Sequence, residues 1–132
     1  MSKIVPVKIL VFSADPALAH KVSSCLKEAG FKVVLTTQGI GAMDVIQSEK
    51  PGLIILDIDL PGFNSLAIIR TLREEVYNGR TPVILMGATI HEENVLIGLE
   101  VGADLCLMEP FHPQVFVARV RSLLRRSETA KE

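Results

Sequence analysis

The chain has 132 residues, of which 48% are hydrophobic and 22% are charged, and its formal net charge is -1. This composition excludes a disordered chain and predicts one domain whose core needs neither disulfides nor metals. The balanced charge argues against nucleic-acid or membrane binding, and no apolar run approaches the roughly 20 residues that span a bilayer. The N-terminus has no signal-peptide pattern, so we expect a cytoplasmic protein.

Five short apolar runs predict β-strands. The run Leu53–Asp57 has no polar alternation until its last residue, which is typical of a strand buried on both faces of a parallel sheet. The other predicted strands are Val7–Phe12, Lys32–Thr37, Pro82–Met86 and a short strand within Ala103–Met108.

A helical pattern follows each predicted strand. Asp15 and Pro16 indicate the start of the first helix, because the carboxylate can cap and proline is tolerated at the first helical position. Gly30 indicates its end. A second, weaker helix is predicted from about Gly41 and ends before Pro51.

Three further helices are predicted from their apolar faces. The third ends before Gly79, the fourth opens with acidic residues and ends at Gly102, and the fifth begins at Pro113. The side chains expected to face inward are Leu66, Ile69, Leu72, Val76, Leu96, Leu99, Phe116, Val120 and Leu123. Those expected to face solvent are Arg119, Arg121, Arg125 and Arg126, followed by a frayed polar tail at 127–132.

The alternation of strands and helices predicts a (βα)5 α/β fold, a doubly wound five-stranded parallel sheet with the order 2-1-3-4-5. We expect a single domain over 1–132 with a core from about 5 to 126. The switch point of this order lies between the first and third strands. It places Ser13, Ala14 and Asp15 beside Asp57.

The two signatures Asp57…Pro61–Gly62 and Gly102–Ala103–Asp104…Pro110–Phe111 carry a family likeness. With the (βα)5 pattern, the chain resembles a response-regulator receiver domain of two-component or phosphorelay signalling. The resemblance implies that Asp57 occupies the position that accepts a phosphoryl group from a histidine kinase with the help of Mg²⁺. It also implies a flavodoxin-like fold and a protein that is not an enzyme.

The chain departs from that family at most positions of the phosphorylation site. The usual acidic pair reads Ser13 and Ala14, the hydroxyl position reads Gly87 followed by Ala88, and the lysine before Pro110 reads Glu109. The aromatic switch position reads Cys106. Phosphoryl transfer needs a cation and donors for the phosphoryl oxygens, so we expect a degenerate site that has no metal and does not undergo normal phosphorylation.

An active phosphoacceptor with a rearranged Mg²⁺ site stays open as an alternative. Asp15 could then join Asp57, Asp59 and Glu109 around a hard cation, although capping the first helix is its simpler role. Thr89 could supply the missing hydroxyl only if its loop shifts by two residues. For Asp57 and Asp59, hydrogen bonding within a turn is the plain structural alternative.

The Asp57-x-Asp59 spacing also resembles the nucleophile and acid/base pair of haloacid-dehalogenase-like phosphatases. That motif normally ends the first strand rather than the third, and Gly87 and Glu109 stand where further catalytic groups are needed. We keep this enzyme only as a remote alternative.

The resemblance implies a partner surface on the fourth helix, fifth strand and fifth helix, including His91, Glu92, Arg119 and Arg126. We expect this surface to bind a histidine kinase, an output domain or another signalling protein, or to form a homodimer. The sequence leaves open whether the chain is complete or part of a larger regulator. The equivalent of the Glu109–Pro110 bond is often cis in receivers, and the sequence leaves both isomers open.

Two cysteines and three histidines show no metal-binding pattern. Cys25 and Cys106 lie far apart in a predicted helix and strand, and we expect buried free thiols. They share no zinc-ligand spacing with His20, His91 or His112.

Overall fold

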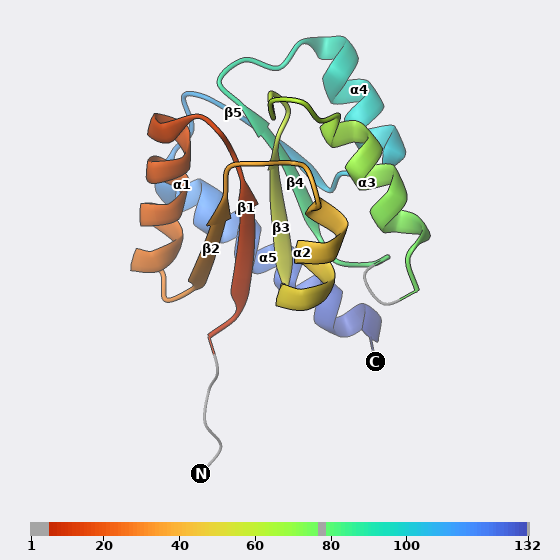
Figure 1. The fold of residues 1–132 in the computed structure, drawn as a ribbon. Helices are drawn as coiled ribbons and strands as arrows, with labels where there is room; N and C mark the ends of the chain where they lie inside the picture. Colours follow the sequence, from red (N-terminus) through yellow and green to blue (C-terminus); the bar gives the residue numbers. More distant parts are fainter. Residues whose placement is uncertain (1–5, 77–78, 132) are drawn as a thin grey trace.

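Five parallel strands form a single sheet in the computed structural model, which describes residues 6–76 and 79–131. The strands are β1 (Lys8–Phe12), β2 (Lys32–Thr36), β3 (Leu53–Asp57), β4 (Val83–Gly87) and β5 (Leu105–Met108). They lie in the order β2-β1-β3-β4-β5 (Figure 1). The predicted topology is confirmed, and β3 has the predicted bounds.

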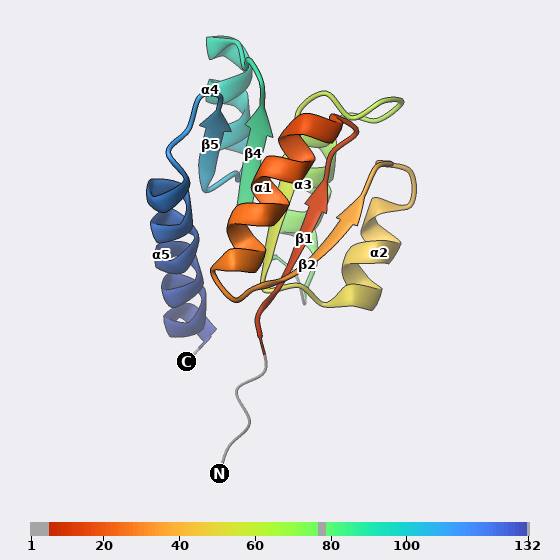
Figure 2. The same ribbon diagram turned by 90° about the vertical axis from the view of Figure 1, so that its left-hand side faces the viewer.

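Helices cover both faces of this sheet. They are α1 (Pro16–Glu28), α2 (Ala42–Glu49), α3 (Ser65–Glu74), α4 (Glu92–Val101) and α5 (Pro113–Lys131). Helices α1 and α5 lie on one face of the sheet, and α2, α3 and α4 lie on the other (Figure 2). The side chains of each group pack into one of two core clusters. Among the described residues, we find no helix with the length and apolar character that crossing a membrane requires.

Side-chain caps fix where the first and third helices begin. The Asp15 carboxylate accepts hydrogen bonds from the backbone amides of Ala17 and Leu18, at 3.1 and 3.2 Å. Asp15 is therefore the cap of α1, as predicted. Asn64 caps α3 in the same way, which sequence analysis did not anticipate. Gly30 ends the first helical segment with a φ of 95°, a conformation that favours glycine.

Helix α4 buries a different face from the predicted one. Leu96 and Leu99 were expected to face inward, but they are 59% and 47% exposed. The buried residue of this helix is Gly98, where a β-carbon would lie 2.8 Å from Cδ2 of Leu85. The helix lies so close to β4 that a β-carbon at this contact would require the end of the Leu85 side chain to shift, and the leucines face outward.

Two predictions near helix ends are also wrong. Val76 was assigned to the apolar face of the third helix, but α3 ends at Glu74 and Val76 is 91% exposed. The tail at 127–132 was expected to fray, whereas α5 continues to Lys131 and Ser127 is buried. Residue 5, the expected start of the core, and residue 132 lie outside the described residues. The four arginines of α5 are exposed, as predicted.

Candidate functional site

Asp57 is the buried centre of the candidate site at the carboxyl end of β3. Its exposed fraction is 3%, and both carboxylate oxygens accept hydrogen bonds. Oδ2 accepts from the Ser13 hydroxyl at 2.8 Å, and Oδ1 accepts from the Asp59 amide at 2.9 Å. The predicted meeting of Ser13 and Asp57 at the switch point is confirmed.

Ser13 connects two loops at this site. It follows β1, is 1% exposed, and its oxygen also accepts a hydrogen bond from the Asp15 amide at 3.2 Å. The result is a chain from the Asp15 amide through the Ser13 hydroxyl to the Asp57 carboxylate. Both donors in this series of hydrogen bonds, the Asp15 amide and the Ser13 hydroxyl, are electrically neutral.

Ser65, at the start of α3, contacts the backbone of Asp57 rather than its carboxylate. Its hydroxyl donates to the Asp57 backbone carbonyl at 2.5 Å, and the residue is 1% exposed. This contact fixes the end of β3 against the following helix. Ser65 was not among the predicted site residues, because a serine near the start of a helix is typical of a capping residue.

Apart from the Asp59 backbone amide, the remaining predicted site residues make no hydrogen bond with Asp57 in the described part of the chain. Asp15 is occupied with its cap, and the other positions are exposed at the sheet edge: Asp59, Ala88, Thr89, Glu109 and Pro110. Ala14 is half-buried. Among the described residues, no group of three or more His, Cys, Asp or Glu side chains is arranged to hold a metal ion.

Gly87 ends β4 in a space that apolar side chains already fill. A β-carbon at this residue would lie 2.9 Å from Cγ2 of Ile58 and 3.0 Å from Cγ1 of Ile90. Carbon atoms that are not bonded normally approach to about 3.5–4.0 Å. The room that a serine or threonine side chain needs at this position is therefore taken by two isoleucines.

The Glu109–Pro110 peptide bond is cis, one of the two isomers that the sequence left open. It follows β5 and precedes α5. Cys106 lies in the middle of β5, where a strand was predicted. Its sulfur lies 4.0 Å from the β-carbon position of Gly98 and so faces α4.

Both cysteines are free, and both are half-buried rather than fully buried as expected. Burial raises the pKa of the Cys106 thiol. Burial also raises the pKa of Cys25, with a further increase from Glu28 and a partial decrease from Lys21. The thiolate is the nucleophile in alkylation, so a raised pKa slows the reaction at neutral pH.

We therefore expect iodoacetamide to alkylate both cysteines more slowly in the folded protein than in the same protein unfolded in urea. Since both pKa values are raised, the rate in the folded protein should continue to increase as the pH passes the ordinary thiol value of 9.0. Mass spectrometry of peptides at a series of pH values measures each rate. Equal rates in the folded and unfolded protein at neutral pH would contradict this prediction.

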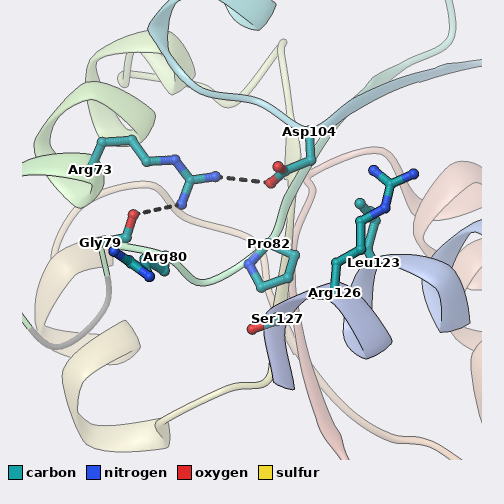
Figure 3. Close-up of a pocket in the computed structure, with 8 residues that line it drawn as sticks. All are labelled: Arg73, Gly79, Arg80, Pro82, Asp104, Leu123, Arg126 and Ser127. Atoms are coloured by element: carbon teal, nitrogen blue, oxygen red, sulfur yellow. Dashed lines mark hydrogen bonds and ion pairs between the residues drawn. The ribbon is translucent and has the colours of Figure 1, made fainter. Parts of the chain in front are cut away.

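A hollow of ≈ 270 Å³ lies away from Asp57, at the amino ends of the parallel strands, where β4 and β5 begin. Arg73 of α3 extends along it and pairs with Asp104 at 2.9 Å (Figure 3). Its guanidinium group also donates to the carbonyl oxygens of Gly79, Gly102 and Thr81. Arg73 is thus engaged in holding loops together at this end of the molecule.

Residues 9–121 match the family model described as the response regulator receiver domain. The chain belongs to the response-regulator receiver family. The sequence is 37% identical over 121 residues to the DNA-binding response regulator MtrA of Mycolicibacterium smegmatis, covering 92% of this chain and 52% of that protein. The chain therefore spans about half the length of the curated relatives it matches.

Solved structures agree with this receiver assignment. A putative response regulator from Chloroflexus aurantiacus aligns with a TM-score of 0.86 and 27% identity, covering 92% of this chain and 99% of that chain. The BeF3-activated receiver domain of Klebsiella pneumoniae RstA aligns with a TM-score of 0.81 and 32% identity, covering 89% and 98%. Receiver domains are generally not enzymes, and they interact with histidine kinases and output domains.

Proposed function

We propose that this receiver domain acts through protein–protein interaction and without Mg²⁺-dependent phosphorylation of Asp57. The main support for the proposal is that both oxygens of the Asp57 carboxylate already accept hydrogen bonds from groups of the protein itself. Neutral donors from Ser13 and Asp59 occupy both oxygens of a side chain that is 3% exposed. A metal ion or a phosphoryl donor that approaches Oδ2 would compete with the Ser13 hydroxyl, which already donates to this oxygen.

The donor set around Asp57 does not fit Mg²⁺. This ion prefers octahedral oxygen coordination and is usually bound through one or two carboxylates together with phosphate oxygens. Here Ser13 and Ala14 replace the acidic pair that the family uses, and the Asp15 carboxylate caps the start of α1. Loss of the acidic ligands supports a pocket in which a hydroxyl, rather than an ion, holds the carboxylate.

Two further positions oppose phosphoryl transfer. Transfer requires stabilisation of the charge that builds on the phosphoryl oxygens. Glu109 provides an anion where the family provides a lysine, and Gly87 provides no hydroxyl. Both changes remove stabilisation from the same transition state, so neither compensates for the other.

Intact mass spectrometry after incubation with acetyl phosphate and Mg²⁺ tests this proposal. We expect no phosphoryl adduct on the wild-type protein, while a receiver that retains the acidic pair and the lysine is modified in parallel. The Asp57→Asn variant is the matched control. An adduct on the wild type that is absent from Asp57→Asn would overturn the proposal and support the alternative of an active phosphoacceptor with a rearranged metal site.

The surface formed by α4, β5 and α5 is the proposed partner face. Its exposed apolar side chains are Leu96, Ile97, Leu99, Met108 and Val115. A hollow of ≈ 470 Å³ lies beside β5 and the start of α5. Apolar side chains that face outward together on neighbouring elements commonly mark an interface. The outward leucines of α4 therefore support a role for this face in binding.

We expect Leu96→Glu to abolish partner binding or self-association without unfolding the domain, because Leu96 is already largely exposed. Sedimentation velocity measures self-association of the wild type and the variant. Pull-down from a lysate of the source organism compares the proteins that each retains. Arg70→Glu, at an exposed position of α3, is the control for added charge. A monomeric wild type that retains no protein lost by Leu96→Glu would count against this face.

The partners we propose are a histidine kinase, an output domain or another signalling protein, with a homodimer as the alternative. The MtrA relative is named a DNA-binding protein, and this chain covers only 52% of its length. With a net charge of -1, this domain has no basic excess for phosphate contacts. We propose that it makes no nucleic-acid or membrane contact itself. A cytoplasmic location stays a prediction.

A further inference from the structure

The loop between β4 and α4 follows the end of β4, which pairs with β3 at Asp57, and the side chain of its Ile90 is buried. Ile90 is 5% exposed and belongs to the same core cluster as Leu56 and Leu85. It is flanked in sequence by the exposed residues Thr89 and His91. Ile90 is thus the residue that attaches this loop to the core.

Ile90 occupies space that the end of β4 would otherwise offer to a side chain. Its Cγ1 lies 3.0 Å from the β-carbon position of Gly87, and Ile58 approaches the same position from the β3 side at 2.9 Å. Isoleucine is branched at its β-carbon and has few rotamers, so it does not readily move aside. Gly87 and Ile90 are therefore sterically coupled.

A second contact ties the loop to the neighbouring strand. The Ile90 amide donates a hydrogen bond to the sulfur of Met108, at 3.4 Å. Met108 ends β5 and is 43% exposed on the proposed partner face. The same residue thus contacts the edge of the Asp57 pocket through its side chain and β5 through its backbone.

We infer that Ile90 is a latch that holds the loop at residues 88–91 in one conformation, with its side chain locked against Gly87 and its amide locked to Met108. This inference does not depend on whether Asp57 is phosphorylated, because the latch consists of packing and one hydrogen bond that do not involve Asp57. It also predicts that a side chain with a hydroxyl at residue 87 cannot be accommodated without rearrangement, since Ile90, together with Ile58, occupies the required space.

A double-mutant cycle tests the steric half of the latch. The variants are Gly87→Ser, Ile90→Ala and both together, with urea midpoints measured by circular dichroism. We expect Gly87→Ser to be markedly destabilising alone and less so when Ile90 is alanine, with the remaining loss due to Ile58, so that the two effects are not additive. Gly87→Ser combined with Ile97→Ala, at an exposed residue of α4, is the matched control and should be additive. Additive effects in both cycles would overturn the latch.

Amide hydrogen exchange measured by NMR tests the second half. In Met108→Leu, which keeps the side-chain size but removes the sulfur acceptor, we expect the Ile90 amide to exchange about tenfold faster while core amides such as Leu10 are unchanged. Ile90→Ala should accelerate exchange in residues 88–91 ahead of the strands. An Ile90 amide that exchanges at the wild-type rate in Met108→Leu, or exchange in Ile90→Ala that rises equally throughout the sheet, would overturn the inference.

Discussion

Replacing Arg73 with alanine is expected to lower the free energy of unfolding by about 2 kcal/mol, a large part of the stability of a small domain. The guanidinium group donates to carbonyl oxygens of Gly79, Thr81 and Gly102 and to the Asp104 carboxylate. Truncation leaves the partly buried carbonyl oxygens without their charged donor, at a cost of about 1–3 kcal/mol, whereas the Asp104 side chain is 39% exposed and adds little. Urea denaturation measures the loss.

Arg73 is sensitive because Asp104 serves two donors. Its Oδ2 accepts from Arg73 Nη2 at 2.9 Å and from the Val83 amide at 2.8 Å. The pair therefore joins α3 to the beginning of both β4 and β5. Arg73→Lys keeps the charge but loses the planar fork of donors, so it should recover only part of the stability.

Arg70→Ala provides the matched control for Arg73. Arg70 lies in the same helix, but its side chain is exposed, and surface substitutions usually change stability by within about 0.5 kcal/mol. If Arg73→Ala and Arg70→Ala had equal effects, the hydrogen bonds of the Arg73 guanidinium group would have no special role in stability.

Ser13→Asp is expected to destabilise the domain by about 3 kcal/mol in the absence of Mg²⁺, because it places an unpaired carboxylate in a buried site next to Asp57. The Ser13 hydroxyl lies 2.8 Å from Asp57 Oδ2 and is 1% exposed. The substitution also converts a hydrogen-bond donor into an acceptor. The repulsion is of the kind that a divalent cation relieves.

Mg²⁺ should therefore restore stability to Ser13→Asp but not to the wild type. A ligand present at 100 times its dissociation constant stabilises the folded state by about 2.7 kcal/mol. Thermal unfolding with and without Mg²⁺ measures this difference. Ser13→Asn has a similar size without the charge and should show no response to Mg²⁺. An equal Mg²⁺ response in the wild type and Ser13→Asp would mean that residue 13 does not decide metal binding.

The sequence identified most of the candidate site because parallel strands bring their carboxyl ends to one edge. Asp57 ends an apolar run, and Ser13 follows the strand that pairs beside it. The strand order alone therefore predicts that the two residues meet. It does not predict the Ser65 hydrogen bond, which depends on how closely α3 returns to the end of β3.

Helix α4 illustrates where the sequence pattern fails. Its residues are apolar on more than one side, so periodicity does not identify the inner face. The close approach to Leu85 decides that Gly98 points inward and that Leu96 points outward. This reversal places the leucines on the proposed partner face. A hydrophobic residue is therefore not evidence of burial unless the opposite face of its helix is polar.

The sequence by itself determined the order and direction of the strands, the cap at Asp15 and the meeting of Ser13 with Asp57, because these follow from local patterns and strand pairing. Tertiary structure alone decided that Ile58 and Ile90 fill the space beside Gly87 and that Arg73 joins three chain segments. Those contacts depend on differences of a few tenths of an ångström in how neighbouring elements pack. Side-chain packing sets these distances, and residue types and their spacing in the sequence do not predict them.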